Sequence, residues 1–101
     1  MFASVTVATA SLDRVDEISE IYERLLPTLE AAAGWRGVYV VVDRATGKGH
    51  LLGLWRSEAD AIEFEAGGTF GRILADYPPG LLLGAPHRTV GEVVFHALRQ
   101  D

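Results

Sequence analysis

The sequence has no cysteine, few basic residues and no long apolar run. Without cysteine the chain forms no disulfide, uses no thiolate nucleophile and builds no cysteine-based zinc site. Nine basic residues against fourteen acidic ones give a net charge of −5. This balance argues against nucleic acid or an anionic membrane surface as a partner. No segment resembles a signal peptide or a membrane span, so we expect a cytoplasmic protein.

Histidine is also scarce, since the chain has only His50, His87 and His96. No two of them are spaced as metal ligands on a helix or strand, so we expect no metal site. His50 and His96 are the candidate catalytic residues, because imidazole exchanges protons near neutral pH. His96, in the last predicted strand, is the better candidate for burial. The plainer interpretation is that His50 makes a structural hydrogen bond or is solvated.

Apolar residues are plentiful, at 49% of a chain of 101 residues. That length predicts a single domain over residues 1–101. Strands are expected at 2–8, 35–43, 49–55 and 89–99, and helices over 11–34, 57–67 and 69–77. Pro27 is expected to kink or interrupt the first helix near Tyr22. Ser57 is expected to cap the second helix, whose buried stripe is predicted to be Ala59, Ile62 and Ala66.

This order, β-α-β-β-α-β, predicts an α+β, ferredoxin-like fold. Its four-stranded antiparallel sheet has the third and first strands in the centre and both helices on one face. The third strand is apolar on both sides, with Leu51 and Trp55 on one and Leu52 and Leu54 on the other. Because the helices cover only one face, we expect a second copy of the chain to cover the other, which makes a homodimer.

Two segments carry a resemblance to a known family. GWRGVYVVVDRATGKG (Gly34–Gly49) resembles the hairpin of the antibiotic-biosynthesis-monooxygenase-like group, within the dimeric α/β-barrel superfamily. LLGLWRSEADAIEF (Leu51–Phe64) resembles that group's junction from an apolar strand into the second helix. The resemblance implies that two sheets pair face to face into a barrel. It also implies one of several activities, because some members oxidise aromatic molecules with oxygen and no cofactor, and others degrade heme.

The chain departs from the residues that the resemblance implies for catalysis. It has no asparagine, Phe64 stands where a helical tryptophan is expected, and Leu74 stands roughly where a heme-ligating histidine is expected. Heme degradation is therefore not expected, and we expect no cofactor. The predicted function is a cofactor-independent monooxygenase acting on a small aromatic or quinone-like molecule. The alternative is a non-catalytic small-molecule-binding or structural dimer module.

A pocket for such a flat ligand is predicted between the helices and the sheet. Its candidate lining is aromatic, with Arg72, His50 or Thr6 as polar groups. The candidate substrate-binding residues are Tyr22, Trp55, Phe64, Phe70, Arg72 and Tyr77. The plainer interpretation is that these aromatic side chains fill the core, and that Trp55 anchors a strand to a helix. Gly53 is expected to let a neighbour such as Tyr39 pack closely.

Overall fold

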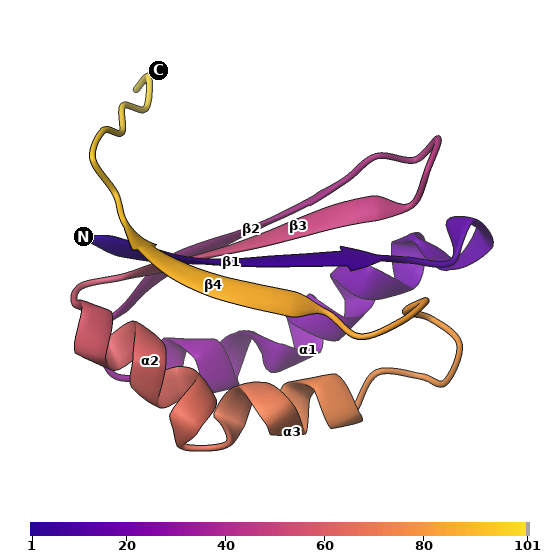
Figure 1. Cartoon of the computed structure of the whole chain (residues 1–101), viewed down its shortest axis with the longest axis horizontal. Helices are drawn as coiled ribbons and strands as arrows, with labels where there is room; N and C mark the ends of the chain where they lie inside the picture. The colour runs from indigo at the N-terminus through magenta and orange to yellow at the C-terminus, as the bar shows by residue number, and fades with distance from the viewer. Residues whose placement is uncertain (101) are drawn as a thin grey trace.

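The structure, a computed structural model, describes residues 1–100. The described chain forms one sheet of four strands and three α-helices (Figure 1). The elements are β1 (Phe2–Thr9), the 3₁₀ helix η1 (Leu12–Arg14), α1 (Asp16–Ala31), β2 (Trp35–Val42), β3 (Lys48–Trp55), α2 (Glu58–Ala66), α3 (Thr69–Ala75) and β4 (His87–Glu92). None of the helices in residues 1–100 is long and apolar enough to cross a membrane.

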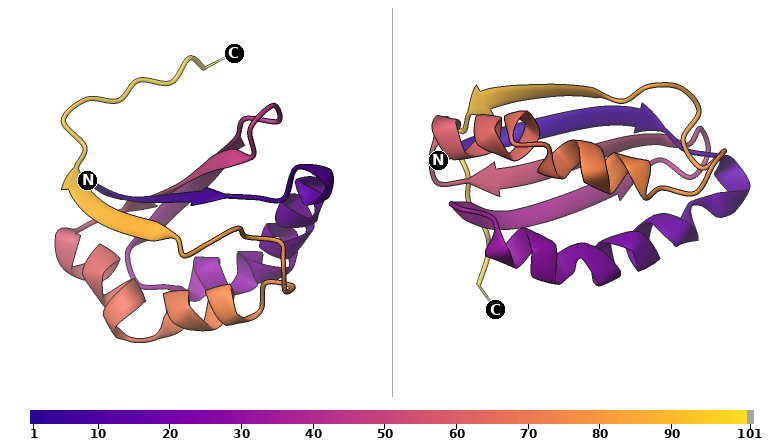
Figure 2. Two further views of the ribbon diagram at one scale, coloured as in Figure 1. Left: turned by 45° about the vertical axis from the view of Figure 1, so that its right-hand side comes forward. Right: turned by 90° about the horizontal axis from the view of Figure 1, so that it is seen from below.

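The strands form one antiparallel sheet in the order β2-β3-β1-β4. All three α-helices lie on the same face of this sheet, as the two views in Figure 2 show. The predicted ferredoxin-like arrangement is therefore confirmed, with β3 and β1 in the centre. Two strands, β2 and β4, form the open edges of the sheet.

The two faces of the sheet differ in their surroundings. Ser4 and Thr6 of β1 are buried against the helices, and their partners on β3 are Gly53 and Leu51. The alternate side chains form the bare face, which carries Ala3, Val5, Val7, Gly37, Tyr39, Val41, His50, Leu52 and Leu54. Tyr39 is 52% exposed and Val41 55% exposed. The predicted apolar character of both faces of β3 is thus confirmed.

The helices correct two sequence-based expectations. The long helix α1 continues through Pro27 rather than breaking there. Pro27 and Glu23 are both on the exposed side, where water can bond the carbonyl that the proline leaves without a donor. In α2 the predicted buried stripe is wrong, since Ala61 is fully buried while Ile62 is 48% exposed.

The remaining two residues of that stripe, Ala59 and Ala66, are exposed as well. The face that α2 turns inward carries Ala61 and Phe64, which are three residues apart and so lie on one side of the helix. The cap itself is confirmed, because the Asp60 backbone N–H donates to Ser57 Oγ at 3.1 Å.

The last strand is shorter than the predicted 89–99 segment and starts earlier. Its final pair joins Glu92 to Phe2, the first residue of β1. One further backbone hydrogen bond follows, in which the Val93 N–H donates to the Met1 carbonyl at 2.9 Å. The chain leaves the sheet after this bond. Residues 93–100 form an extended segment, which we call the C-terminal arm.

The apolar loop before β4 belongs to the core. Leu81 is fully buried and packs with Ala10, Val15, Ile18 and Ile21. The Ser11 N–H donates to the Leu81 carbonyl at 2.8 Å, which fixes the loop against the end of β1. This loop therefore closes one end of the space between the helices and the sheet.

Candidate functional site

Two small cavities lie side by side between the helices and the sheet. The larger has a volume of about 50 Å³ and the smaller about 30 Å³. Four residues line both of them, namely Thr6, Tyr22, Leu51 and Phe70. The surroundings are mainly apolar, as in sites for flat organic ligands, but such sites usually exceed about 300 Å³. Each cavity is therefore too small for an aromatic molecule unless the surrounding residues move.

The polar centre of the site is a pair of tyrosines. The Tyr77 hydroxyl, just after α3, donates to the Tyr22 hydroxyl of α1 at 2.8 Å. Their rings meet edge to face, with centroids 6.4 Å apart. Burial raises the pKa of both phenols, and the neighbouring Tyr77 raises that of Tyr22 further. Both phenols are therefore neutral at physiological pH. Because Tyr22 accepts the hydrogen bond from Tyr77, its own hydroxyl can donate a hydrogen bond to an oxygen atom of a ligand in the cavity.

An aromatic row continues from this pair toward the end of β3. The ring centroids of Trp55 and Phe64 are 4.8 Å apart, and those of Phe64 and Phe70 are 6.4 Å apart. Trp55 is 2% exposed, and its indole N–H donates to Ser4 Oγ at 3.1 Å. Trp55 thus joins β3 to β1 and to α2, in agreement with its plainer interpretation as a core anchor. It also lines the smaller cavity.

Gly53 leaves space for Ser4 and Trp55 rather than for Tyr39, the neighbour expected from the sequence. Tyr39 lies on the bare face, whereas a Cβ at Gly53 would point toward the helices. There it would lie 2.7 Å from Ser4 Oγ and 3.0 Å from Trp55 Nε1. The glycine therefore makes room for the hydrogen bond between Trp55 and Ser4.

Arg88 is a site residue that the sequence analysis missed. It stands on β4 with its side chain 6% exposed, directed toward the helices. Its guanidinium lies 5.2 Å from the centre of the Phe70 ring and donates to the Ala61 carbonyl at 2.9 Å. It also pairs with Glu65 at 3.0 Å. The predicted last strand begins at Thr89 and so leaves Arg88 out. A strand predicted from His87 would have included Arg88 and placed it, by alternation, on the face toward the helices.

The structure brings together five of the six predicted substrate-binding residues. Tyr22, Trp55, Phe64, Phe70 and Tyr77 all line one or both cavities. The sixth, Arg72, is exposed on α3, where it donates to Thr69 Oγ1 at 3.1 Å. It faces outward because α3 turns Phe70 and Ile73 inward.

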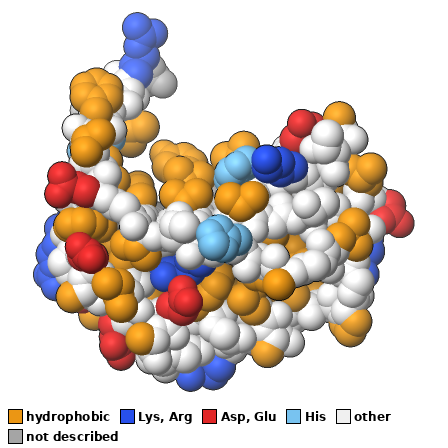
Figure 3. All heavy atoms as spheres, in the orientation of Figure 1, with side chains coloured by type: hydrophobic (Ala, Val, Ile, Leu, Met, Phe, Trp, Pro, Cys, Tyr) orange, Lys and Arg blue, Asp and Glu red, His pale blue; other side chains and the backbone are white. Residues whose placement is uncertain are grey.

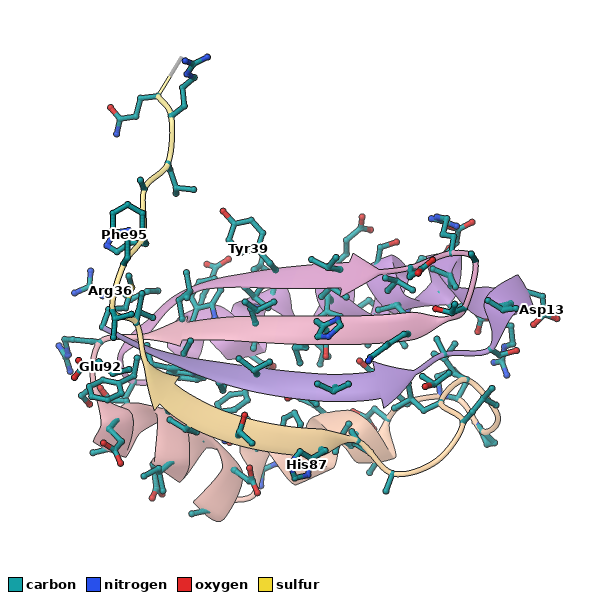
Figure 4. All side chains as sticks on the ribbon, turned by 45° about the horizontal axis from the view of Figure 1, so that its top comes forward. Asp13, Arg36, Tyr39, His87, Glu92 and Phe95 are labelled. Atoms are coloured by element: carbon teal, nitrogen blue, oxygen red, sulfur yellow. The ribbon has the colours of Figure 1, made fainter. Side chains whose placement is uncertain are left out.

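Of the two histidine candidates, His50 is one of the residues around the larger cavity. It pairs with Val7, so strand alternation directs its side chain to the bare face. His96 is exposed on the C-terminal arm, so its predicted burial in a strand is wrong. Figure 4 shows the bare face from above, with Tyr39 standing up from β2. Within residues 1–100, no three His, Asp or Glu side chains are grouped to hold a metal ion.

Comparison with known proteins gives a clear result at the level of structure only. No family model matches the chain, and no curated protein matches its sequence. Solved structures match along nearly the whole chain. The heme-degrader MhuD from Mycobacterium tuberculosis, solved with two hemes bound in its active site, has a TM-score of 0.76 at 11% identity, covering 96% of this chain and 99% of its own.

Two further structures carry the family description. A Bordetella bronchiseptica protein assigned as an antibiotic biosynthesis monooxygenase has a TM-score of 0.76 at 14% identity, covering 93% of this chain and 97% of its own. An antibiotic biosynthesis monooxygenase has a TM-score of 0.68 at 14% identity, with 93% and 99% covered. The chain has the fold of the antibiotic biosynthesis monooxygenases. This monooxygenase-like fold accommodates more than one chemistry, so the activity must be argued from the site.

Proposed function

We propose that the chain binds a small, flat aromatic or quinone-like molecule between its helices and its sheet. The observation that carries the proposal is the half-buried pair Tyr22–Tyr77, in which Tyr22 lines both apolar cavities and Tyr77 the larger one. A neutral phenol is a hydrogen-bond donor to a quinone or phenol oxygen, and the aromatic row beside it suits the ring. The structural neighbour MhuD, with hemes in its active site, is a precedent for a flat ligand in this fold.

Binding requires the two cavities to merge. Phe70 lines both and stands in the first turn of α3, a helix of only seven residues. Gly67 and Gly68 join this helix to α2, and Gly68 has a φ of +90°, which favours glycine. We expect α3 to move outward about this junction and to carry Phe70 away from Leu51, as lids do on ligand entry.

The reaction proposed for this site is a cofactor-independent oxidation. With 1-naphthol as substrate, one oxygen atom of O₂ is added at the ring carbon para to the hydroxyl and the other leaves as water. The products are 1,4-naphthoquinone and water, and the naphthol supplies all four electrons. In this scheme Tyr22 donates a hydrogen bond to the substrate oxygen. The alternative is a non-catalytic binding module. It is favoured because Arg88, which lines the smaller cavity, is already bonded to Ala61 and Glu65.

Heme does not fit this site. The resemblance places a heme-ligating histidine near Leu74, and Leu74 lines the larger cavity without offering a ligand atom. His87 is at the outer edge of β4 and His96 is on the arm, while His50 borders the larger cavity but has the register of the bare face. We therefore propose neither heme binding nor heme degradation.

The binding proposal has a built-in spectroscopic readout. Both tryptophans, Trp35 and Trp55, line the smaller cavity, so bound 1,4-naphthoquinone should quench their fluorescence. Replacing Tyr22 with phenylalanine removes one hydrogen bond to the ligand, which should weaken binding about tenfold. Tyr39→Phe is the matched control, because it removes a hydroxyl from the bare face. Equal affinity in the wild type and Tyr22→Phe would contradict the proposed contact.

The catalytic proposal is tested with an oxygen electrode and 1-naphthol. Oxygen uptake with one quinone formed per O₂, reduced in Tyr22→Phe and unchanged in Tyr39→Phe, is the expected result. Saturable quenching by naphthoquinone without oxygen uptake would favour the non-catalytic module. The absence of both quenching and uptake would overturn the ligand proposal itself.

We also propose that the protein works as a homodimer joined through its bare faces. Tyr39 and Val41 of β2 are more than half exposed there, beside Leu52 and Leu54 of β3. An apolar area of this kind is uncommon on a monomer and is typical of an interface. Face-to-face packing of two such sheets about a two-fold axis buries the same patch on both copies.

A further inference from the structure

The direction of the hydrogen bond between the two cavity tyrosines decides what Tyr22 offers to a ligand. The Tyr77 hydroxyl donates to the Tyr22 hydroxyl at 2.8 Å, and Tyr22 lines both cavities whereas Tyr77 lines only the larger one. A phenolic hydroxyl has one proton and can both donate and accept. Among residues 1–100 the Tyr22 hydroxyl makes no second hydrogen bond. Because Tyr77 occupies Tyr22 as an acceptor, the Tyr22 proton is left for a ligand.

Tyr77 is held in this position by contacts outside the pair. It follows α3 directly, and its backbone N–H donates to the Leu74 carbonyl at 3.1 Å. Two residues further on, the Pro79 carbonyl accepts from Arg14 Nη1 at 2.9 Å. Figure 3 shows mainly apolar and other uncharged groups over this end of α3, at the lower right of the molecule. The Tyr77 hydroxyl therefore has a fixed place, to which it returns when α3 closes over a ligand.

We propose that Tyr77 is a positioning residue, which acts through Tyr22 and makes the site selective for a ligand oxygen that accepts a hydrogen bond. The inference rests on the proposed ligand site and deepens it, since a quinone carbonyl is such an acceptor. In the closed site three oxygens form a chain of hydrogen bonds, from Tyr77 to Tyr22 to the ligand. Each bond in such a chain polarises the next, so Tyr77 strengthens a contact that it does not make itself.

The test begins with Tyr77→Phe, which removes the donor and keeps the ring. In this variant the Tyr22 hydroxyl is free to turn, so it can accept from a ligand hydroxyl as readily as it donates. The dissociation constant of 1,4-naphthoquinone, which only accepts, should rise about threefold. The dissociation constant of 1-naphthol, which can donate, should stay the same or fall. Calorimetric titration under nitrogen measures both, since the naphthol is not consumed without oxygen.

Two controls make the result specific to this hydrogen bond. Tyr39→Phe removes a hydroxyl from the bare face and should leave both dissociation constants within about twofold. The double variant Tyr22→Phe/Tyr77→Phe should bind both ligands as Tyr22→Phe alone does, because Tyr77 acts only through Tyr22. Circular dichroism of each variant verifies that the fold is kept.

The two ligands separate positioning from a merely structural role. An equal rise of both dissociation constants in Tyr77→Phe would overturn the inference, since a loosened site weakens every ligand. Unchanged naphthoquinone binding in Tyr77→Phe, or an effect of this change in the Tyr22→Phe background, would also overturn it and leave the ligand site in place. If neither ligand binds the wild type, the ligand proposal fails and the inference fails with it.

Discussion

At the scale of single residues, the hydrogen bond between Trp55 and Ser4 governs the packing of the central strands. It requires the space that Gly53 leaves open, because a side chain there would meet both partners. Trp55 in turn supports Phe64 and one wall of the smaller cavity. A residue without a side chain therefore decides the shape of the candidate site, although it contributes no chemistry to it.

Replacing Gly53 with alanine should lower the free energy of unfolding by about 1–3 kcal/mol, because the added methyl displaces Ser4 or the indole. Gly49→Ala is the matched control on the same face of β3, where the nearest atom is Val42 Cγ2 at 3.5 Å. It should change the stability by less than about 0.5 kcal/mol. Urea denaturation followed by tryptophan fluorescence measures both, and equal losses would contradict the role given to Gly53.

At the scale of elements, the helix layer is held to β4 by one buried arginine. Arg88 bonds the Ala61 carbonyl of α2 and stacks on Phe70 of α3, so it joins three elements at one point. Its partner Glu65 is 55% exposed and contributes little in water. The planar guanidinium of Arg88 has several N–H donors, so it can bond Ala61 and Glu65 and stack on Phe70 at the same time. A lysine ammonium group is a single point charge and could not make all three contacts.

The variant Arg88→Lys should therefore destabilise the protein by about 1–3 kcal/mol through lost hydrogen bonds and stacking. Glu65→Gln, which keeps the size of the partner, should cost less than about 1 kcal/mol. Chemical denaturation compares the two variants. If Glu65→Gln costs as much as Arg88→Lys, the exposed ion pair rather than the contacts to α2 and Phe70 holds the layers.

At the scale of the whole molecule, the sheet divides the chain into a covered and an uncovered half. Two adjacent leucines of β3 have their side chains on opposite faces of the sheet. Leu51 lines both cavities, whereas Leu52 pairs with Val5 and Tyr39 on the bare face. The same substitution at these two positions therefore has different consequences.

We expect Leu52→Asp to keep the fold and lose the dimer, because a buried unpaired carboxylate disfavours the interface. Leu51→Asp should prevent folding, since it buries the charge against the helices. Circular dichroism reports the fold and sedimentation the mass. A folded, dimeric Leu52→Asp variant would show that the bare face is not the interface.

Much of the architecture follows from local patterns in the sequence. The β-branched runs, the hairpin at Gly47 and the cap at Ser57 depend on neighbouring residues, so the element order and the strand order were predicted correctly. The alternation of Leu51 and Leu52 likewise predicted a sheet that is apolar on both faces. Five of the predicted aromatic residues line the cavities, because aromatic side chains beside an apolar sheet pack toward it.

The tertiary structure decided what depends on contacts between distant segments. The last pair of β4 joins Glu92 to Phe2 of β1, and no pattern within residues 89–99 reveals that limit. The inward turn of Arg88 depends on the register between β4 and β1, and the bond between Tyr22 and Tyr77 joins two segments that are 55 residues apart. The sequence by itself determined the fold, whereas the pairing of strands and helices determined the site.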